Sequence, residues 1–145
     1  MRKECLFRLT RHITFLEDEL KDHEKFKLLS WEDYNHDRSK RRDVERWVEN
    51  IVNSCIDIAK TILTSEGLPI ADTYKEIVAS LSLVPAFDKE TMEKLSEWVR
   101  LRNIIVHEYL DIRWSFIKKF VLETKTLYED FLYRAKKYIE IKMKG

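Results

Sequence analysis

Glycine and proline are scarce in this chain of 145 residues, because each occurs only twice. Sandwiches and barrels need many turn residues, and phosphate-binding or dinucleotide-binding loops need clustered glycines, so the count excludes both groups. With 44% hydrophobic and 37% charged residues, the chain can bury a core. The composition therefore favours a single helical domain over residues 1–145.

Cysteine, charge of one sign and long apolar runs are also lacking. Cys5 and Cys55 are too few for a disulfide scaffold or a zinc site, and they predict buried thiols in a reducing cytosol. Lys and Arg number 27 against 26 Asp and Glu, so any contact with nucleic acid needs a local basic patch. No stretch approaches the ~20 apolar residues of a membrane span, and no signal region opens the chain. We expect a cytoplasmic protein.

Apolar residues spaced three and four positions apart predict four long helices and one short helix. Gly67 and Pro69 end the second long helix, and Pro85 ends the short one. Two long helices precede the short one and two follow it, which is typical of an antiparallel four-helix bundle with one additional short helix. The apolar stripes run over residues 6–20, 44–62, 74–81, 92–99 and 114–138.

Three helix starts carry candidate capping residues. We expect Asp72 or Thr73 to cap the short helix, with Tyr74, Ile77, Val78 and Leu81 on one face. Asp88 is expected to cap the fourth predicted helix, which continues to residue 107. Either Asp111 or Ser115 is expected to cap the last helix.

Metal chemistry has little support in the sequence. Di-iron bundles use Glu-x-x-His pairs on facing helices, and none of the four histidines has a glutamate three residues before it. No zinc-type spacing of histidine and cysteine occurs. We predict neither a metal site nor a cofactor.

A basic segment over residues 38–46 has two interpretations. It is either the solvated start of a helix or a surface for RNA or a partner. Cations are unfavourable at the positive N-terminal end of a helix dipole, which leaves the second interpretation open. The cationic residues of the basic segment are Arg38, Lys40, Arg41, Arg42 and Arg46.

The stretch from Arg102 to Tyr109 places an arginine, an asparagine, a histidine and a tyrosine around three apolar residues. Asn103 and His107 are one turn apart and share a helix face. Arg102 and His107 are five residues apart, about 140° around a regular helix. Either the helix bends here, or two copies of the chain build a composite site.

Histidine and arginine at this spacing suit the cleavage of RNA. A histidine can accept or donate a proton near neutral pH, and an arginine can hold a phosphate and stabilise its transition state. No metal is needed when the ribose 2′-hydroxyl is the nucleophile, which makes RNA the substrate. A histidine near a helix end is otherwise a capping or packing residue, so spacing alone leaves both interpretations open.

Residues 102–107, Arg-Asn-Ile-Ile-Val-His, resemble the Arg-x4-6-His motif of the HEPN superfamily. Extended through Tyr109, they are similar to the Arg-x4-His-x-Tyr form of its HepT toxin branch. Residues 42–46 and 56–59 resemble the second helix of that branch, and residues 68–76 resemble its loop and short helix. The resemblance covers roughly residues 1–140.

The resemblance implies a HEPN-like bundle that is the toxin of a type VII-like toxin–antitoxin pair. Such a toxin is a metal-independent endoribonuclease, and its antitoxin is a minimal nucleotidyltransferase. Carried over to this chain, Arg102 and His107 form the catalytic pair, and Asn103 supports it. Tyr109 is the residue that the antitoxin would modify with AMP. We expect a homodimer or a larger assembly.

Two other classes of function compete with the toxin. HEPN domains also serve as non-catalytic nucleotide-binding or adaptor modules beside nucleotidyltransferases. A third class is a structural bundle in which Arg102 and His107 pair with carboxylates across a dimer interface. The intact arginine and histidine favour the enzyme, and a nucleotidyltransferase gene next to this one would support it.

Overall fold

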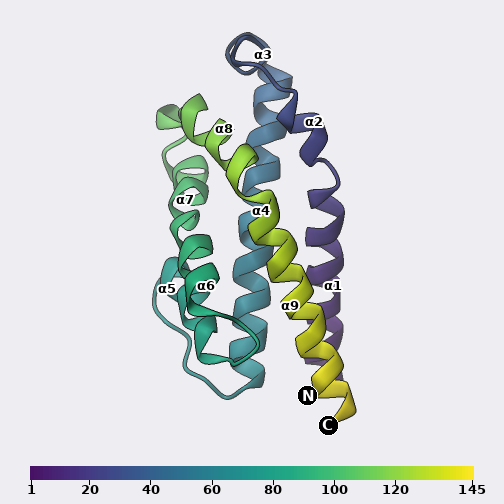
Figure 1. Ribbon diagram of the computed structural model, residues 1–145. Coiled ribbons are helices and arrows are strands. Elements are labelled where there is room, and N and C mark those ends of the chain that lie inside the picture. The colour runs from purple at the N-terminus through teal and green to yellow at the C-terminus, as the bar shows by residue number, and fades with distance from the viewer.

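The computed structural model describes residues 1–145 and is built from helices alone (Figure 1). Four rods lie side by side: α1, α4, the pair α6–α7 and the pair α8–α9. The short α5 packs against α4 and α6. The predicted four-helix bundle is confirmed, and so is the short helix predicted after its second long helix. The rods and α5 are α1 (Lys3–Leu20), α4 (Arg38–Ser65), α5 (Tyr74–Ser80), α6 (Lys89–Glu97), α7 (Val99–His107), α8 (Trp114–Glu123) and α9 (Lys125–Lys144).

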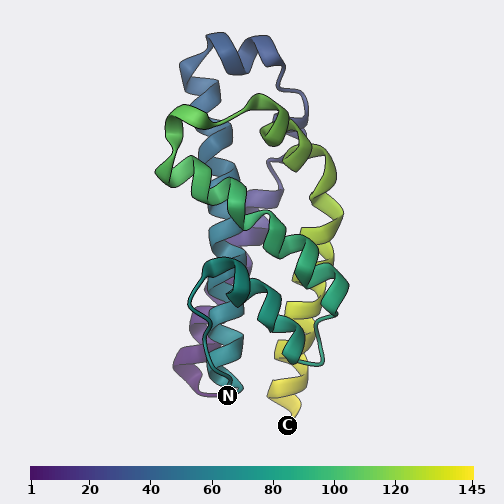
Figure 2. The same cartoon turned by 90° about the vertical axis from the view of Figure 1, so that its left-hand side faces the viewer.

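The long helix α4 lies at the centre of this arrangement. Seen from the side in Figure 2, it runs along most of the molecule, and α7 crosses in front of it. Its buried residues contribute to one hydrophobic core that also takes side chains from the other rods. No helix of the chain is long and apolar enough to cross a membrane.

Two helices expected to be continuous are each broken once. The fourth predicted helix breaks at Trp98 into α6 and α7, and the last breaks at Thr124 into α8 and α9. The Trp98 ring packs edge-on against Phe120, with 5.4 Å between ring centroids. The buried Thr124 hydroxyl donates to the Phe120 carbonyl at 2.6 Å. Tertiary packing around Phe120 therefore accompanies both breaks, with no glycine or proline at either.

The chain between α1 and α4 contains two short helices that the apolar pattern did not predict. These are α2 (His23–Lys27) and α3 (Trp31–His36). The buried His23 anchors α2, because its Nε2 lies 2.7 Å from the Val121 carbonyl oxygen on α8. A capping box between Ser30 and Asp33 begins α3. Both helices are too short for a periodic stripe to emerge.

The ends of the helices confirm most of the predicted boundaries. Gly67, at φ +69°, follows α4 in the left-handed conformation that closes a Schellman motif. Thr73 and Asp88 accept backbone hydrogen bonds and cap α5 and α6, as expected. The cap expected at Asp111 or Ser115 is wrong, since α8 begins after Arg113 with no side-chain cap.

The two thiols differ in burial. Cys55 is buried in the core as predicted, and burial raises the pKa of its thiol well above the usual range. Cys5 is half-buried, with its Sγ 3.8 Å from the Thr61 carbonyl oxygen. Both cysteines are free.

Candidate active site

The motif predicted from sequence lies on α7. Val99 and Leu101 are buried and hold this helix against the core, so Arg102 is set at the edge of the packed region. The helix is regular from Val99 to His107, and the Glu108 amide still donates to the Ile104 carbonyl at 2.8 Å. No bend brings Arg102 towards His107, so within one chain their side chains leave α7 about 140° apart.

Three side chains hold the guanidinium of Arg102. Its Nε donates to Asn53 Oδ1 on α4 at 2.7 Å, and one Nη donates to Asn103 Oδ1 at 3.0 Å. Its Cζ lies 5.0 Å from the centroid of the Tyr74 ring on α5. Three elements of the bundle thus fix one half-buried arginine, and its remaining N–H groups are free to bind an anion.

A second cation also contacts the Tyr74 ring. The Lys60 ammonium lies 4.7 Å from the same ring centroid. Cation–π contacts of this kind hold charge without neutralising it, because the ring is not an anion. Ile77, Val78 and Leu81, which are predicted to share a face with Tyr74, are buried, whereas the Tyr74 side chain is 40% exposed and packs on Arg102.

His107 lies at the open end of α7. It is the last residue of the helix and is exposed, and its side chain takes part in none of the hydrogen bonds or ion pairs of the chain. Its imidazole is therefore available to a molecule outside this protomer. Unlike Arg102, it has no side chain that sets its orientation.

Tyr109 follows in the single turn η2 (Tyr109–Asp111), which contains no buried residue. Its side chain is 71% exposed, and that of Leu110 is 87% exposed. The phenol side chain therefore reaches solvent. The hydroxyl is open to an enzyme that approaches this end of α7.

The basic segment forms the first turns of α4, which begins at Arg38 rather than near residue 44. Asp37 caps the helix by accepting from the Lys40 amide at 3.1 Å, and its carboxylate offsets the cations that follow. Lys40 also pairs with Asp33 at 3.3 Å. Arg46 precedes Asn53 by seven residues, about 10 Å along the helix axis. The basic segment is thus a surface of its own, outside the contacts that hold Arg102.

Sequence reasoning missed Asn53 and the role of Tyr74. Asn53 belongs to a polar stripe on α4 with Asn50 and Asp57, spaced three and four apart beside the apolar stripe of residues 44–62. That stripe was the available signal. Its partner on α7 is 49 positions away, which periodicity cannot identify. No group of three or more His, Cys, Asp or Glu side chains is placed to hold a metal ion.

Comparison with known proteins agrees with this architecture. The family model described as Ribonuclease HepT-like matches residues 16–135. A search of curated proteins finds no match. The solved structures described below share 20% sequence identity or less with this chain, so they support the fold alone.

Three solved structures are similar over nearly the whole chain. One is a tri-AMPylated Shewanella oneidensis HEPN toxin in complex with an MNT antitoxin, at 20% identity and a TM-score of 0.78, covering 94% of this chain and 98% of that one. A toxin–antitoxin with AMP-PNP has 18% identity and a TM-score of 0.77, covering 93% and 99%. The cytosolic protein of unknown function YutE from Bacillus subtilis has 15% identity and a TM-score of 0.80, covering 94% and 92%.

Proposed function

The chain belongs to the HepT-like ribonuclease family, and from that premise we propose that it is the toxin of a toxin–antitoxin pair, an endoribonuclease that acts through Arg102 and His107. The observation that carries the proposal is the arrangement of Arg102. Asn53 and Asn103 orient its guanidinium, Tyr74 packs on its face, and no carboxylate neutralises it. A structural ion pair would need a carboxylate partner here.

In this proposal Arg102 binds the phosphate at which the RNA is cut. Its free N–H groups donate to the non-bridging oxygens, whose negative charge grows in the transition state. Asn53 and Asn103 hold the Arg102 guanidinium in place before the substrate arrives. Little reorganisation is then needed during the reaction.

His107 acts as the general base. It takes the proton from the ribose 2′-hydroxyl, the 2′-oxygen forms a bond to phosphorus, and the bond from phosphorus to the 5′-oxygen breaks. The departing 5′-oxygen takes up a proton from water, and His107 returns its proton to solvent. The products are a 2′,3′-cyclic phosphate and a 5′-hydroxyl, and the RNA itself supplies the nucleophile.

The composite site needs a homodimer, alone or within a larger assembly. Because α7 is straight, His107 of one protomer is better placed to meet Arg102 of a second protomer than its own. Ile104, Ile105 and Val106 are each half-buried within the chain, which leaves apolar surface for this contact.

Mixing two inactive variants tests the composite site. In a mixed dimer of Arg102→Ala and His107→Ala protomers, one site keeps both residues and the other loses both. Random exchange of subunits therefore restores about a quarter of the wild-type activity. Activity that stays at the level of the separate variants would show that both residues act within one chain.

The family assignment and the exposed Tyr109 support regulation by a minimal nucleotidyltransferase. The phenol oxygen would attack the α-phosphorus of ATP, pyrophosphate would leave, and the phenol proton would pass to solvent. AMP on Tyr109 then places a phosphodiester anion where it can occupy Arg102 and repel RNA.

The tryptic peptide Asn103–Arg113 contains Tyr109 as its only tyrosine and reports on this step. Co-expression with the neighbouring nucleotidyltransferase should add one or more adenylate masses to the peptide and silence the nuclease. Tyr109→Phe should escape both effects. If the partner neutralises Tyr109→Phe as fully as the wild type, it works by masking alone.

The nuclease itself is tested with purified protein and single-stranded RNA in excess EDTA. We expect cleavage that continues in the chelator and stops when a 2′-deoxy residue replaces the ribose at the cut. Cleavage that requires added divalent metal, or that proceeds on the 2′-deoxy substrate, contradicts the mechanism.

A further inference from the structure

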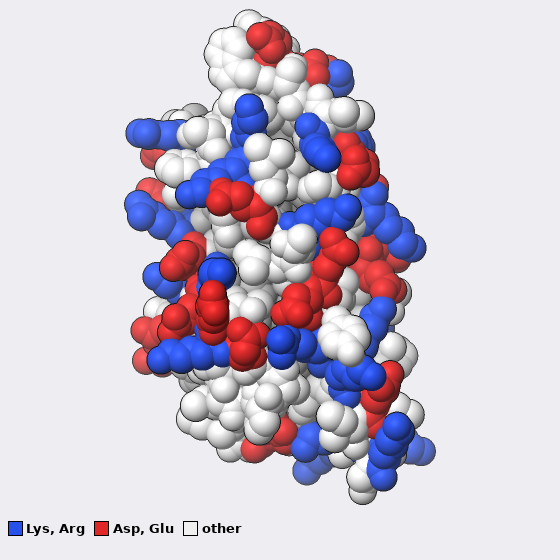
Figure 3. Space-filling view, in the orientation of Figure 1, with Lys and Arg blue, Asp and Glu red and all other residues white.

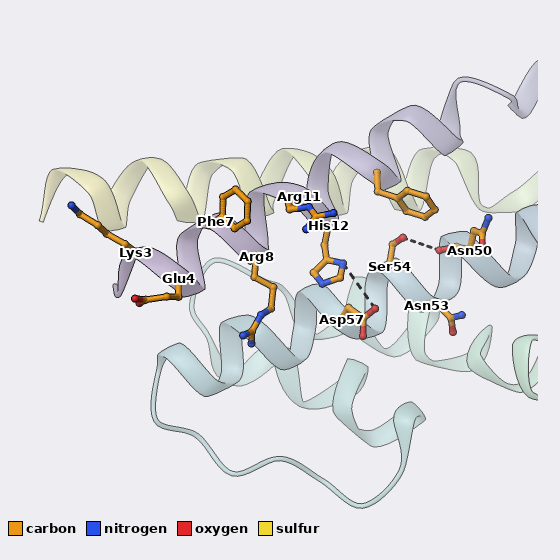
Figure 4. A pocket seen from close by; sticks show the side chains of 11 residues that line it. Lys3, Glu4, Phe7, Arg8, Arg11, His12, Asn50, Asn53, Ser54 and Asp57 are labelled. Carbon is orange, nitrogen blue, oxygen red and sulfur yellow. Dashed lines mark hydrogen bonds and ion pairs between the residues drawn. The ribbon is translucent and has the colours of Figure 1, made fainter.

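A groove of about 780 Å³ lies between α1 and α4, with side chains of α1 on one wall and those of α4 on the other (Figure 4). Neither the motif on α7 nor the basic segment contributes a residue to it. The family model begins at residue 16, so the α1 wall, residues 3–15, precedes the matched part of the chain.

Cations without partners line the groove. Lys3, Arg8 and Arg11 form no ion pair within the chain, which for the two arginines holds along the whole sequence except at Arg134. The groove also holds two carboxylates, Glu4 and Asp57, and Asp57 faces His12 at 4.0 Å; three cations thus stand against two carboxylates. On the face shown in Figure 3, by contrast, positive and negative side chains are interspersed. The groove therefore offers unpaired positive charge to an anionic ligand.

Two phenylalanines in the groove are exposed to solvent. The side chain of Phe7 is 65% exposed and that of Phe15 is 44% exposed. The Arg11 guanidinium lies 5.8 Å from the Phe7 ring centroid. The two rings are eight residues apart on α1, about 12 Å along its axis, which accommodates roughly three stacked nucleotides. Aromatic rings beside arginines are the usual platform for unpaired bases.

Asn53 connects the groove to the proposed active site. Its side chain lines the groove, and its Oδ1 accepts the 2.7 Å hydrogen bond from Arg102. A strand whose cleaved phosphate sits on Arg102 can thus continue past Asn53 into the groove. Asn50 and Asn53 add amide groups that can bond to base edges or ribose hydroxyls.

The charge of the groove disfavours a second copy of the chain as its occupant. A two-fold contact of this face with itself would bring a surface with more cations than carboxylates against its own copy. Duplex RNA is disfavoured too, because paired bases cannot stack on Phe7 or Phe15. A single strand satisfies both the cations and the rings.

We propose that the groove between α1 and α4 binds the single-stranded RNA that flanks the phosphate held by Arg102. Arg8 and Arg11 bind backbone phosphates, and Phe7 and Phe15 stack on bases. The proposal rests on the ribonuclease activity proposed above for its biological meaning, but binding to the groove can be measured without cleavage.

The first test measures binding of a fluorescein-labelled 12-nucleotide single-stranded RNA by anisotropy, in a His107→Ala background that prevents turnover. Arg8→Ala with Arg11→Ala should weaken binding tenfold or more at low salt. It should also reduce the slope of log Kd against log salt by about 1.4, as expected for two lost phosphate contacts to a single strand. Phe7→Ala with Phe15→Ala should weaken binding tenfold or more at every salt concentration without changing that slope.

The matched control removes two cations outside the groove. Lys27 and Lys118 are exposed and unpaired, and Lys27→Ala with Lys118→Ala should bind RNA as the parent protein does. Groove variants that bind like this control overturn the proposal, as does a parent protein that binds no RNA. Equal competition by duplex RNA would remove the single-strand assignment. All four substituted groove residues are exposed, so circular dichroism should show unchanged helicity.

A second test uses turnover and separates the two proposals. With His107 intact, the groove variants should raise KM for the same RNA about tenfold, the loss falling on KM rather than kcat. If the wild type cuts no RNA, the ribonuclease proposal fails while the binding assay still decides the groove. If sedimentation shows that the groove variants dissociate into monomers, the face joins two copies and the RNA assignment is overturned.

Discussion

The two ends of α7 differ in how firmly the bundle holds them. At Arg102, side chains from α4, α5 and α7 itself contact the guanidinium. At His107 and Tyr109, five to seven residues later, the chain is exposed and η2 buries no side chain. We call these the anchored end and the open end of α7.

This difference separates two requirements of the proposed chemistry. A phosphate clamp works best when it is rigid, because its donors must already point at the developing charge. The open end has to meet two further molecules, a second protomer and a modifying enzyme. An exposed, loosely held segment reaches them at little conformational cost.

The largest expected effect is on catalysis, where the two ends should fail in different ways. Arg102→Ala and His107→Ala should each lower RNA cleavage by about a hundredfold to ten-thousandfold. Arg102→Lys keeps the positive charge but lacks the planar guanidinium that donates two parallel hydrogen bonds, so its cleavage rate should lie between those of Arg102→Ala and the wild type. Single-turnover cleavage of a defined RNA measures all three. An Arg102→Lys protein as active as the wild type would show that the anchoring contacts are irrelevant.

Stability should follow the same division. Leu101 is buried at the anchored end, and Leu101→Ala should lower the free energy of unfolding by about 3 kcal/mol through lost burial and a cavity. Leu110 is exposed at the open end, and Leu110→Ala should change the free energy of unfolding by less than about 0.5 kcal/mol. Urea unfolding followed by circular dichroism compares the pair. Similar losses in both variants would mean that the open end is packed in solution.

Asn53 allows a finer test of the anchoring itself. Asn53→Ala removes the acceptor of the Arg102 Nε, so kcat should fall by about tenfold while the fold is retained. Asn53→Asp keeps an acceptor but adds a negative charge that repels RNA, so it should mainly raise KM for RNA. Asn35→Ala, on the exposed face of α3, is the control. If Asn53→Ala leaves kcat unchanged, Arg102 does not depend on α4 for its position.

The smallest effect concerns the helix that leads into the anchored end. Asp88 caps α6 by accepting from the Thr91 amide at 2.9 Å, and this hydrogen bond lowers the pKa of its carboxyl. Asp88→Ala should cost about 1 kcal/mol of stability at pH 7.

The pH dependence of the Asp88 contribution has a definite sign. Because the folded pKa lies below the unfolded one, the contribution is present above the ordinary carboxyl pKa and is lost as the pH falls through the folded value. The gap between wild type and Asp88→Ala should therefore shrink below about pH 4. Asp72→Ala removes a carboxylate that caps nothing, since Thr73 caps α5, and should show neither effect.

The sequence predicted the bundle because most of its rods have one apolar stripe and a recognisable end. Local rules identify the helix ends, because each depends on residues close by in the sequence: Gly67 and Pro69 end α4, and Thr73 and Asp88 cap α5 and α6. The breaks at Trp98 and Thr124 depend on packing around Phe120, and neither position carries a local breaker.

The candidate site shows the same limit. The spacing of residues 102–109 predicted that the candidate site lies on α7. The contacts that orient Arg102 come from Asn53 on α4 and Tyr74 on α5, and no rule of spacing connects those residues to an arginine on another helix. The basic segment was the strongest charge signal in the chain, yet it lies outside the contacts that hold Arg102.

The helix α4 has a consequence for how the proposed nuclease can be controlled. It is one helix of 28 residues, about 42 Å long, with no glycine or proline at which to bend. It bears the basic segment at its start and Asn53 near its middle, and its buried face is fixed in the core. A partner docked on the basic segment meets a rigid rod, so it cannot shift Asn53 without moving the whole helix against its packing. The architecture thus favours orthosteric inhibitors, which compete for the guanidinium, over allosteric ones that act by distorting it.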